Sequence, residues 1–310
     1  MVPRWLATFV TTRPSRPVPA QRNSPSFVSL LEKLQLPRVP GGVVWHHTDA
    51  AGAVGVLTGG HVWAGWSRHL NDESEVQHGI EFIRRHWDRA KGNYARTASL
   101  ERLLADREER TDELLSHCFV CCATLQKDSL STFRGYGAYA LGIDVQLFTP
   151  DFHHGREQVT GQVPNGIGWR TVAYTEAEKE ARAKALFDAW DVLLSSWPAG
   201  SMASGVGQTW VDALYELTIV HMKHESFADE REARFYIWST PSDPRRRVRV
   251  ARNSITPYIP LELDVVNGVR EIRVGPGVDR GAATSESLSD FLQYQVGSIA
   301  RAVDARLPFR

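Results

Sequence analysis

The spacing of apolar and polar residues predicts a mixture of strands and helices. Short β-branched or aromatic runs are typical of strands, and apolar positions at helical spacing are typical of helices. The expected strands cover residues 43–45, 61–65, 117–124, 139–145, 234–238, 261–265 and 269–274. The expected helices cover residues 29–36, 50–57, 74–91, 97–117, 175–197, 206–223 and 286–302. Because the two types mix without strict alternation, we predict an α+β fold.

Composition divides the chain into an arm and one domain. Residues 1–38 are rich in Arg, Pro and Ser, which predicts a poorly ordered N-terminal arm with a short helix near its end. Residues 39–310 have the size of a single domain. Within this domain, residues 128–137 and 151–170 carry several glycines and are expected to be connections rather than helices or strands.

Charge and cysteine content narrow the setting. Lys plus Arg and Asp plus Glu both number 36, so no net charge draws the whole protein to nucleic acid or anionic lipid. A local basic run, Arg245-Arg-Arg-x-Arg249, could still form a positively charged patch on this neutral protein. No apolar run approaches the roughly 20 residues of a membrane span. We therefore expect that the protein does not enter the membrane. Three cysteines within five residues make a poor disulfide framework, so we expect a cytoplasmic protein.

The common catalytic and metal motifs are missing from the sequence. It contains no Gly-x-Ser-x-Gly elbow, no phosphate-binding Gly-x-x-x-x-Gly-Lys loop and no His-Glu-x-x-His pair. Cys118 and Cys121 have the spacing of zinc ligands, but on a strand they face opposite sides, and no second cysteine pair exists. We therefore predict no metal site.

Two polar clusters, far apart in the sequence, each lie beside a predicted strand. His46, His47 and Thr48 follow the apolar run Val43–Trp45, and a strand end is a rigid place from which to present polar groups. If the strand continues, the two imidazoles face opposite ways. The second cluster covers residues 223–234, where Arg231 or Arg234 could hold the Glu232 carboxylate in a cleft. Each cluster also has a plain structural explanation, as a buried histidine pair or a solvated helix end.

Several segments, taken in order, resemble one bacterial family. They are Trp45-His-His-Thr48, Leu70-Asn-Asp-x-x-Glu75, Ser129-Leu-Ser-Thr-Phe-Arg-Gly-Tyr136, Lys223-His-x-x-Phe227-x-x-Glu230-x-Glu232-x-Arg234 and Glu271-Ile-Arg-Val-Gly-Pro276. As a set they are similar to the domain-of-unknown-function family 2971, over about residues 43–300. That family carries no established reaction, so this resemblance alone implies no chemistry.

A more distant resemblance implies a mechanism. Trp45-His46-His47-Thr48, followed by Val54-Gly-Val-Leu57 and Gly59-Gly60, is similar to the first motif of ADP-ribosyltransferases of the poly-ADP-ribose polymerase and diphtheria-toxin type. The resemblance implies a split β-sheet with flanking helices around NAD. By position, His46 would bind the adenosine ribose and Thr48 would lie near the nicotinamide amide. His47 stands where that family has a glycine.

The same resemblance implies roles for later residues. Glu232 is expected to be the catalytic carboxylate, with Glu230 as the second choice. Trp63 or Tyr136 would stack on nicotinamide, while Ser129 and Arg134 would contact the cofactor, Arg134 at the pyrophosphate. The enzyme would cleave the nicotinamide–ribose bond through an oxocarbenium-like species. It would transfer ADP-ribose to an acceptor that the sequence leaves open: protein, nucleic acid or water. A toxin or defence role is compatible with this chemistry.

Two other functions stay open from the sequence. The first is a non-catalytic module of the same fold that binds a nucleotide or a protein partner. The second is a nucleic-acid processing protein, indicated by the basic run that ends at Arg249 and by the arginines of the arm. The enzyme hypothesis depends on one spatial condition, that His46 and Glu232 line a common site.

Overall fold

A ten-stranded mixed β-sheet with flanking helices forms the protein, so the predicted α+β class is confirmed. The computed structural model describes residues 26–39, 42–69, 74–148, 168–196, 205–251, 254–305 and 307. The strands are β1 (Val43–Thr48), β2 (His61–Trp66), β3 (Cys118–Thr124), β4 (Tyr139–Asp144), β5 (Trp169–Thr171), β6 (Glu232–Trp238), β7 (Arg247–Ala251), β8 (Ser254–Glu262), β9 (Val269–Val274) and β10 (Arg301–Asp304).

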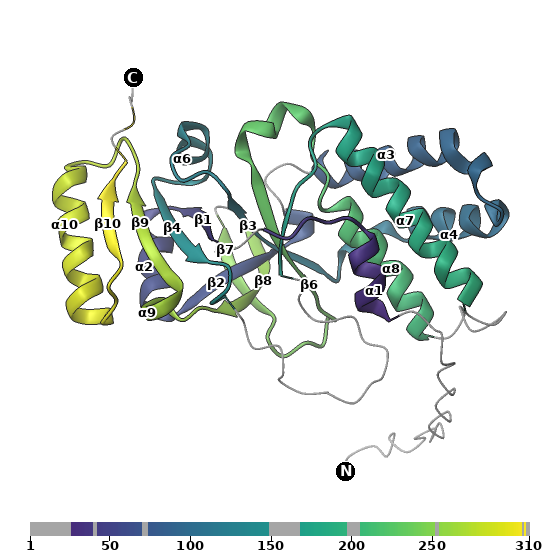
Figure 1. Ribbon diagram of the computed structural model, residues 1–310. Coiled ribbons are helices and arrows are strands. Elements are labelled where there is room, and N and C mark those ends of the chain that lie inside the picture. The colour runs from purple at the N-terminus through teal and green to yellow at the C-terminus, as the bar shows by residue number, and fades with distance from the viewer. Residues whose placement is uncertain are drawn as a thin grey trace, which may run out of the picture.

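Helices gather mainly at one end of the sheet. Figure 1 shows α3, α4, α7 and α8 at that end, and α10 beyond β10 at the opposite end. The helices are α1 (Phe27–Lys33), α2 (Ala50–Gly59), α3 (Ser74–Ala90), α4 (Thr97–Glu109), α5 (Thr111–Leu115), α6 (Leu130–Tyr136), α7 (Glu176–Ser196), α8 (Gly205–Ile219), α9 (Val265–Gly268) and α10 (Gly281–Phe291). Short 3-10 turns include η1 (Ser67–His69), η2 (Lys91–Asn93) and η4 (Glu225–Glu230), and a π-helical turn, η5 (Leu292–Val296), follows α10. In the part of the chain that the structure describes, no helix has both the length and the apolarity needed to cross a bilayer.

The connection from β1 to α2 is tight and follows from its sequence. The Asp49 side chain caps α2 by accepting a hydrogen bond from the Gly52 backbone N–H at 2.7 Å. A Cβ at position 52 would lie only 2.0 Å from the Thr48 hydroxyl, so glycine lets the strand end pack against the first helical turn. The helix ends at Gly60, whose φ of 66° is the left-handed conformation that glycine adopts readily.

Strand β3 organises the sheet because three strands pair with it. One edge of β3 pairs with β6 along its whole length, from Cys118 opposite Trp238 to Thr124 opposite Glu232. The other edge is shared. Strand β2 pairs near the start of β3, where Gly65 is opposite Val120, and β1 pairs at its end, where Trp45 is opposite Thr124. Since β1 and β2 take opposite ends of one edge, they diverge from each other.

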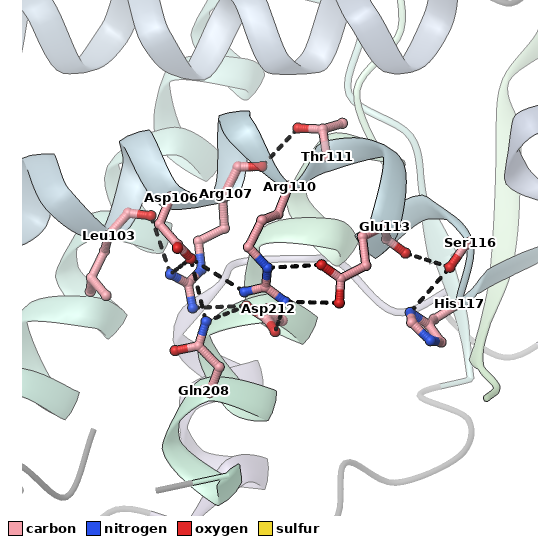
Figure 2. Close-up of polar contacts among 10 residues, drawn as sticks. All are labelled: Leu103, Asp106, Arg107, Arg110, Thr111, Glu113, Ser116, His117, Gln208 and Asp212. Carbon is pink, nitrogen blue, oxygen red and sulfur yellow. Dashed lines mark hydrogen bonds and ion pairs between the residues drawn. The ribbon is translucent and has the colours of Figure 1, made fainter. Parts of the chain in front are cut away.

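The two faces of β3 contribute to separate cores. One face packs against α3, α7 and α8, and the large buried side chains of that core are Trp87, Phe187, Trp190, Tyr215 and Tyr236. The other face joins apolar residues of β1, β2, β4 and α2, including Val44, Leu57, Val62 and Leu141. Within the helical layer an ionic cluster joins α4 to α8 (Figure 2). Arg107, which is 1% exposed, lies 2.8 Å from the Asp212 carboxylate.

Some predicted elements need correction. Residues 128–137, expected to be a connection, contain α6, because the Ser129 side chain caps a helix by accepting from the Thr132 backbone N–H. The helix expected over 97–117 breaks into α4 and α5. The helix expected over 286–302 begins earlier and gives way to β10, while the strand expected over 261–265 splits between β8 and α9.

Two of the regions expected to lack regular structure are described only in part. Residues 151–167 of one expected connection lie outside the described residues, while Trp169–Thr171 form β5. Residues 1–25 of the expected arm also lie outside them. Its last part forms α1, whose Leu30 is fully buried in the helical core.

Candidate functional site

A cluster of buried charged side chains lies where β6 begins. It consists of Glu75 in the first turn of α3, Lys223 after α8, Glu230 at the end of η4, and Glu232 and Arg234 on β6. We call these five residues the strand cluster. Lys223 and Arg234 are each 1% exposed. Burying charges is unfavourable unless they are paired, so this degree of burial requires close ionic contacts.

Lys223 joins all three carboxylates of the strand cluster. Its Nζ lies 2.7 Å from Glu75 Oε1, 2.6 Å from Glu230 Oε2 and 3.4 Å from Glu232 Oε2. Burial disfavours the ammonium charge, but the attraction of Glu232 and Glu75 outweighs burial and raises the pKa of Lys223. Lys223 is therefore a fixed positive charge that links η4 and β6 to α3.

Arg234 holds Glu232 by both carboxylate oxygens. Its Nε donates to Oε1 at 3.0 Å and its Nη2 donates to Oε2 at 2.8 Å, while Nη2 also reaches Glu75 Oε2 at 2.5 Å. Burial opposes ionisation of Glu232, but Arg234 and then Lys223 outweigh it and lower the pKa of Glu232 to about 2. Of the two arginines that the sequence offered, Arg234 is the one that binds this carboxylate.

Glu230 differs from the other two carboxylates because it reaches solvent. Its side chain is 17% exposed, against 6% for Glu75 and 8% for Glu232. It accepts a hydrogen bond from the hydroxyl of Tyr136, at the end of α6, at 3.1 Å. Burial raises the pKa of Tyr136, so the phenol stays protonated and donates. At formal charges, three carboxylates and two cations leave the strand cluster with a net charge of −1.

His46 contacts the same residue of β3 as Glu232 does. Its Nδ1 lies 3.1 Å from the backbone carbonyl of Cys122, while the Cys122 thiol hydrogen-bonds the Glu232 carboxylate. Since a carbonyl only accepts, Nδ1 carries the proton and Nε2 is left as an acceptor. Burial lowers the pKa of His46, so the ring is neutral at pH 7. Trp45 shares a sheet face with Thr124 and Glu232, so His46 points toward the other face. The structure thus brings His46 and Glu232 to either side of Cys122 without a direct contact between them among the described residues.

His47 and Thr48 have packing roles at the same strand end. His47 Nε2 lies 3.2 Å from the Thr132 hydroxyl of α6, and its ring packs edge-on against Phe133 at 4.7 Å. Burial lowers the pKa of His47 to about 4, so this ring is neutral as well. Thr48 packs against Gly52. These contacts position α6 on β1.

Helix α6 and its N-cap residue together carry three of the predicted site residues. Ser129 caps the helix and its hydroxyl lies 2.9 Å from that of Ser131. Arg134 is an exposed residue of the last turn. Tyr136 is 37% exposed at the helix end, beside Glu230. The structure therefore brings Tyr136 to the strand cluster and leaves Ser129 as a capping residue.

Trp63 lies in a second aromatic and basic group that the sequence did not reveal as a unit. It is 42% exposed on β2, and its ring centroid is 4.7 Å from that of Tyr258 on β8. The guanidinium of Arg249, on β7, lies 5.3 Å from the Trp63 ring centroid. In the sequence, residues 245–249 stand out only as a basic run, and no local signal could show that the arginines of this run meet Trp63.

A hollow of about 680 Å³ lies elsewhere, between α3 and the α4–α5 segment. Its lining includes Gln77, Glu81, Arg84, Glu108 and Thr111, and contains no predicted site residue. Within the described residues, no group of three or more His, Cys, Asp or Glu side chains is arranged to hold a metal ion.

Comparisons with family models, with curated proteins and with solved structures found no match for this chain. Function must therefore be inferred from the side-chain geometry described above.

Proposed function

We propose that this chain is an NAD-dependent ADP-ribosyltransferase-like enzyme that binds NAD where β1 and β2 diverge along β3. One observation carries the proposal: His46 and Glu232 both contact Cys122, His46 at its backbone carbonyl and Glu232 at its thiol. Support also comes from the split pairing along β3, in which β1 and β2 hold opposite ends of one edge. This pairing agrees with the split sheet that the Trp45–Thr48 motif implies.

The net negative charge of the strand cluster suits the chemistry. When the nicotinamide–ribose bond breaks, the bonding electron pair moves to the ring nitrogen and positive charge develops on the ribose. A preorganised negative charge, partly shielded from water, stabilises that transition state. An acceptor nucleophile then forms the new bond to the ribose carbon and releases its proton to water.

Within the cluster, we assign the ribose contact to Glu230. Both oxygens of Glu232 are already bound by Arg234, and its side chain is 8% exposed. Glu230 is more exposed and lies beside the Tyr136 ring, which is the aromatic that we place against nicotinamide. Glu232 then acts as a positioning residue that fixes Arg234 and Lys223. His46, with Nε2 free to accept, would bind a ribose hydroxyl at the adenosine end.

The test measures nicotinamide release from NAD by the full chain and by Glu230→Gln. Removing a single charge-stabilising group costs about 100- to 1,000-fold in kcat, so we expect a loss of that size with NAD affinity changed by only a few-fold. The matched control is Glu225→Gln, which makes the same change at an exposed position of η4. An unmodified protein that neither binds NAD in calorimetry nor releases nicotinamide would overturn the proposal.

A second candidate is a nucleotide-binding module without catalysis. The observation that favours it is the complete pairing of Glu232, which is typical of a structural ionic cluster. This candidate predicts that NAD binds but that nicotinamide is never released, and that Glu230→Gln leaves NAD affinity nearly unchanged.

A further inference from the structure

Trp63, Tyr258, Arg247 and Arg249 form an exposed aromatic and basic face, which we call the Trp63 platform. The residues come from three neighbouring strands, since β2 pairs with β8 and β8 pairs with β7. Tyr258 is opposite both Gly65 and Arg247, which places these side chains on one face of the sheet. Trp63 and Tyr258 pack with their rings tilted by 39°, and Arg249 lies over Trp63.

The arginines of this face keep their positive charge unneutralised. Arg245 pairs with Asp243 at 2.7 Å, and Arg246 donates to the backbone carbonyl of Ser116 at 3.1 Å, so both are committed inside the fold. Arg247 and Arg249 are exposed, and no carboxylate among the described residues pairs with either. The chain as a whole has zero formal net charge, so this platform is a local positive surface on a neutral protein.

The Trp63 platform adjoins the proposed NAD site. Gly65 lies on the same face of β2 as Trp63, and it is opposite Val120 of β3. Val120 lies on the same face of β3 as Cys122, and Cys122 is opposite Arg234. The platform and the strand cluster therefore occupy the same face of the sheet. Arg249 is also close enough to His46 to help lower the pKa of that imidazole, after burial. A Cβ at Gly65 would meet no atom within 4 Å, so the surface there is open.

We propose that the Trp63 platform binds single-stranded nucleic acid and presents it as the acceptor of ADP-ribose; the acceptor half of this proposal rests on the proposed function. Bases stack on exposed aromatic rings and on guanidinium planes, and arginines bind the phosphates. An acidic peptide would be attracted by the arginines but would gain little from an exposed Trp and Tyr pair. In the transfer, a base nucleophile bonds to the ribose carbon, nicotinamide leaves with the bonding pair, and the base proton passes to water.

The binding test uses the full chain without NAD. A fluorescent single-stranded oligonucleotide of about 12 nucleotides, as DNA and as RNA, is titrated with protein and its anisotropy is measured. We expect binding that weakens as salt rises. Trp63→Ala and Arg249→Gln should each weaken it about 10-fold or more, and Trp63→Phe should retain most of it. The control is Arg301→Gln, which removes one exposed charge on β10 at the far end of the sheet and should change the affinity less than about two-fold.

The possible failures separate the two proposals. No anisotropy change would overturn nucleic-acid binding even if nicotinamide release proceeds, and the proposed function would then stand with another acceptor. Equal competition by an acidic peptide, together with unchanged binding by Trp63→Ala, would show attraction by charge alone and would also overturn it. With radiolabelled NAD, label on the oligonucleotide supports the acceptor role, whereas label on protein only, or no label, overturns that role. Thermal melting of each variant verifies that it is folded.

Discussion

The protein contains two ionic clusters with similar members and different surroundings. The helical cluster joins Arg107 and Arg110, at the end of α4, to Asp106, Asp212 and Glu113 (Figure 2). The strand cluster also combines two cations with three carboxylates. In the helical cluster, however, the Asp106 and Glu113 side chains are 45% and 59% exposed, whereas no carboxylate of the strand cluster exceeds 17%. Water therefore screens the excess negative charge in the helical cluster but has little access to it in the strand cluster.

The pKa shifts of one carboxyl group in each cluster show the same contrast. Burial raises the pKa of Asp212 in spite of the nearby Arg107. In the strand cluster, Arg234 and Lys223 overcome burial and lower the pKa of Glu232 to about 2. The helical cluster links α4 to α8 mainly through the Arg107–Asp212 ion pair. The strand cluster, in contrast, holds several ionised groups at fixed positions. That property suits a site that stabilises positive charge as it develops on a bound ligand.

Removing the central arginine of each cluster should give the largest difference. Arg234→Gln leaves Glu75 and Glu232 buried without their main partner, so the free energy of unfolding should fall by about 3–5 kcal/mol. Arg107→Gln leaves Asp106 open to solvent and Asp212 still 3.7 Å from Arg110, so we expect a smaller loss of about 1–3 kcal/mol. Urea denaturation of both variants, with the unmodified chain as reference, measures the two losses. Equal losses would show that the difference in solvent access has no energetic consequence.

Lowering the pH should change the stability contributed by the two clusters in opposite directions. The pKa of Glu232 falls from its usual 4.5 to about 2 on folding, so its ionised form stabilises the fold above pH 4.5. That contribution, at most about 3 kcal/mol, is lost as the pH falls from 4.5 toward 2. The advantage in unfolding free energy of the unmodified chain over Glu232→Gln should therefore shrink over this interval.

Asp212→Asn is the matched comparison in the helical cluster. Because the pKa of Asp212 is raised on folding, protonation favours the fold and this contribution declines as the pH rises above 3.8. The free energy of unfolding of the unmodified chain should therefore rise relative to that of Asp212→Asn as the pH falls. Denaturation curves measured between pH 5 and 3 for both pairs test the opposite slopes. Parallel slopes would contradict the assigned pKa directions.

The smallest change in stability should come from Tyr136→Phe. This substitution removes the hydroxyl that donates to Glu230 but keeps the ring at the end of α6. Because both partners are partly exposed, unfolding free energy should change by less than about 1 kcal/mol. If Glu230 holds the ribose, nicotinamide release should fall by about 10-fold with the NAD affinity little changed. Loss of NAD binding without loss of stability would instead show that the Tyr136 hydroxyl helps to bind NAD itself and not the transition state.

Local sequence signals predicted most elements of the fold but not its long-range pairing. Asp49 and Gly60 mark the ends of α2, and the β-branched run Val43–Trp45 predicted the beginning of β1. Helix α6 was missed because its seven residues include Gly135, and its cap, Ser129, is also a common turn residue. Strand β10 was missed because its sequence continues an apparently helical pattern, and its pairing with β9 is a tertiary contact that no local period reports.

The candidate site was predictable as a set of residue types and not as an arrangement. The sequence singled out His46, Glu230, Glu232 and Tyr136, and the structure places all four around β3, η4 and α6. Glu75, in the first turn of α3, joins the cluster only through the fold. The stacking of Arg249 on Trp63 depends on the register of β2, β8 and β7. Strand register is set across tens of residues, so a local reading of the chain cannot supply it.

The two ends of helix α6 form hydrogen bonds with different parts of the protein. Near its start Thr132 meets His47 of β1, and at its end Tyr136 meets Glu230 of η4. A molecule that displaces the Tyr136 hydroxyl from Glu230 would therefore remove the hydrogen bond at one end of the helix, while the contacts of Thr132 and Phe133 with His47 would still hold the other end. The seven-residue helix α6 thus joins the strand that carries the histidines to the turn that carries Glu230, so a shift of the helix would change the surroundings of both.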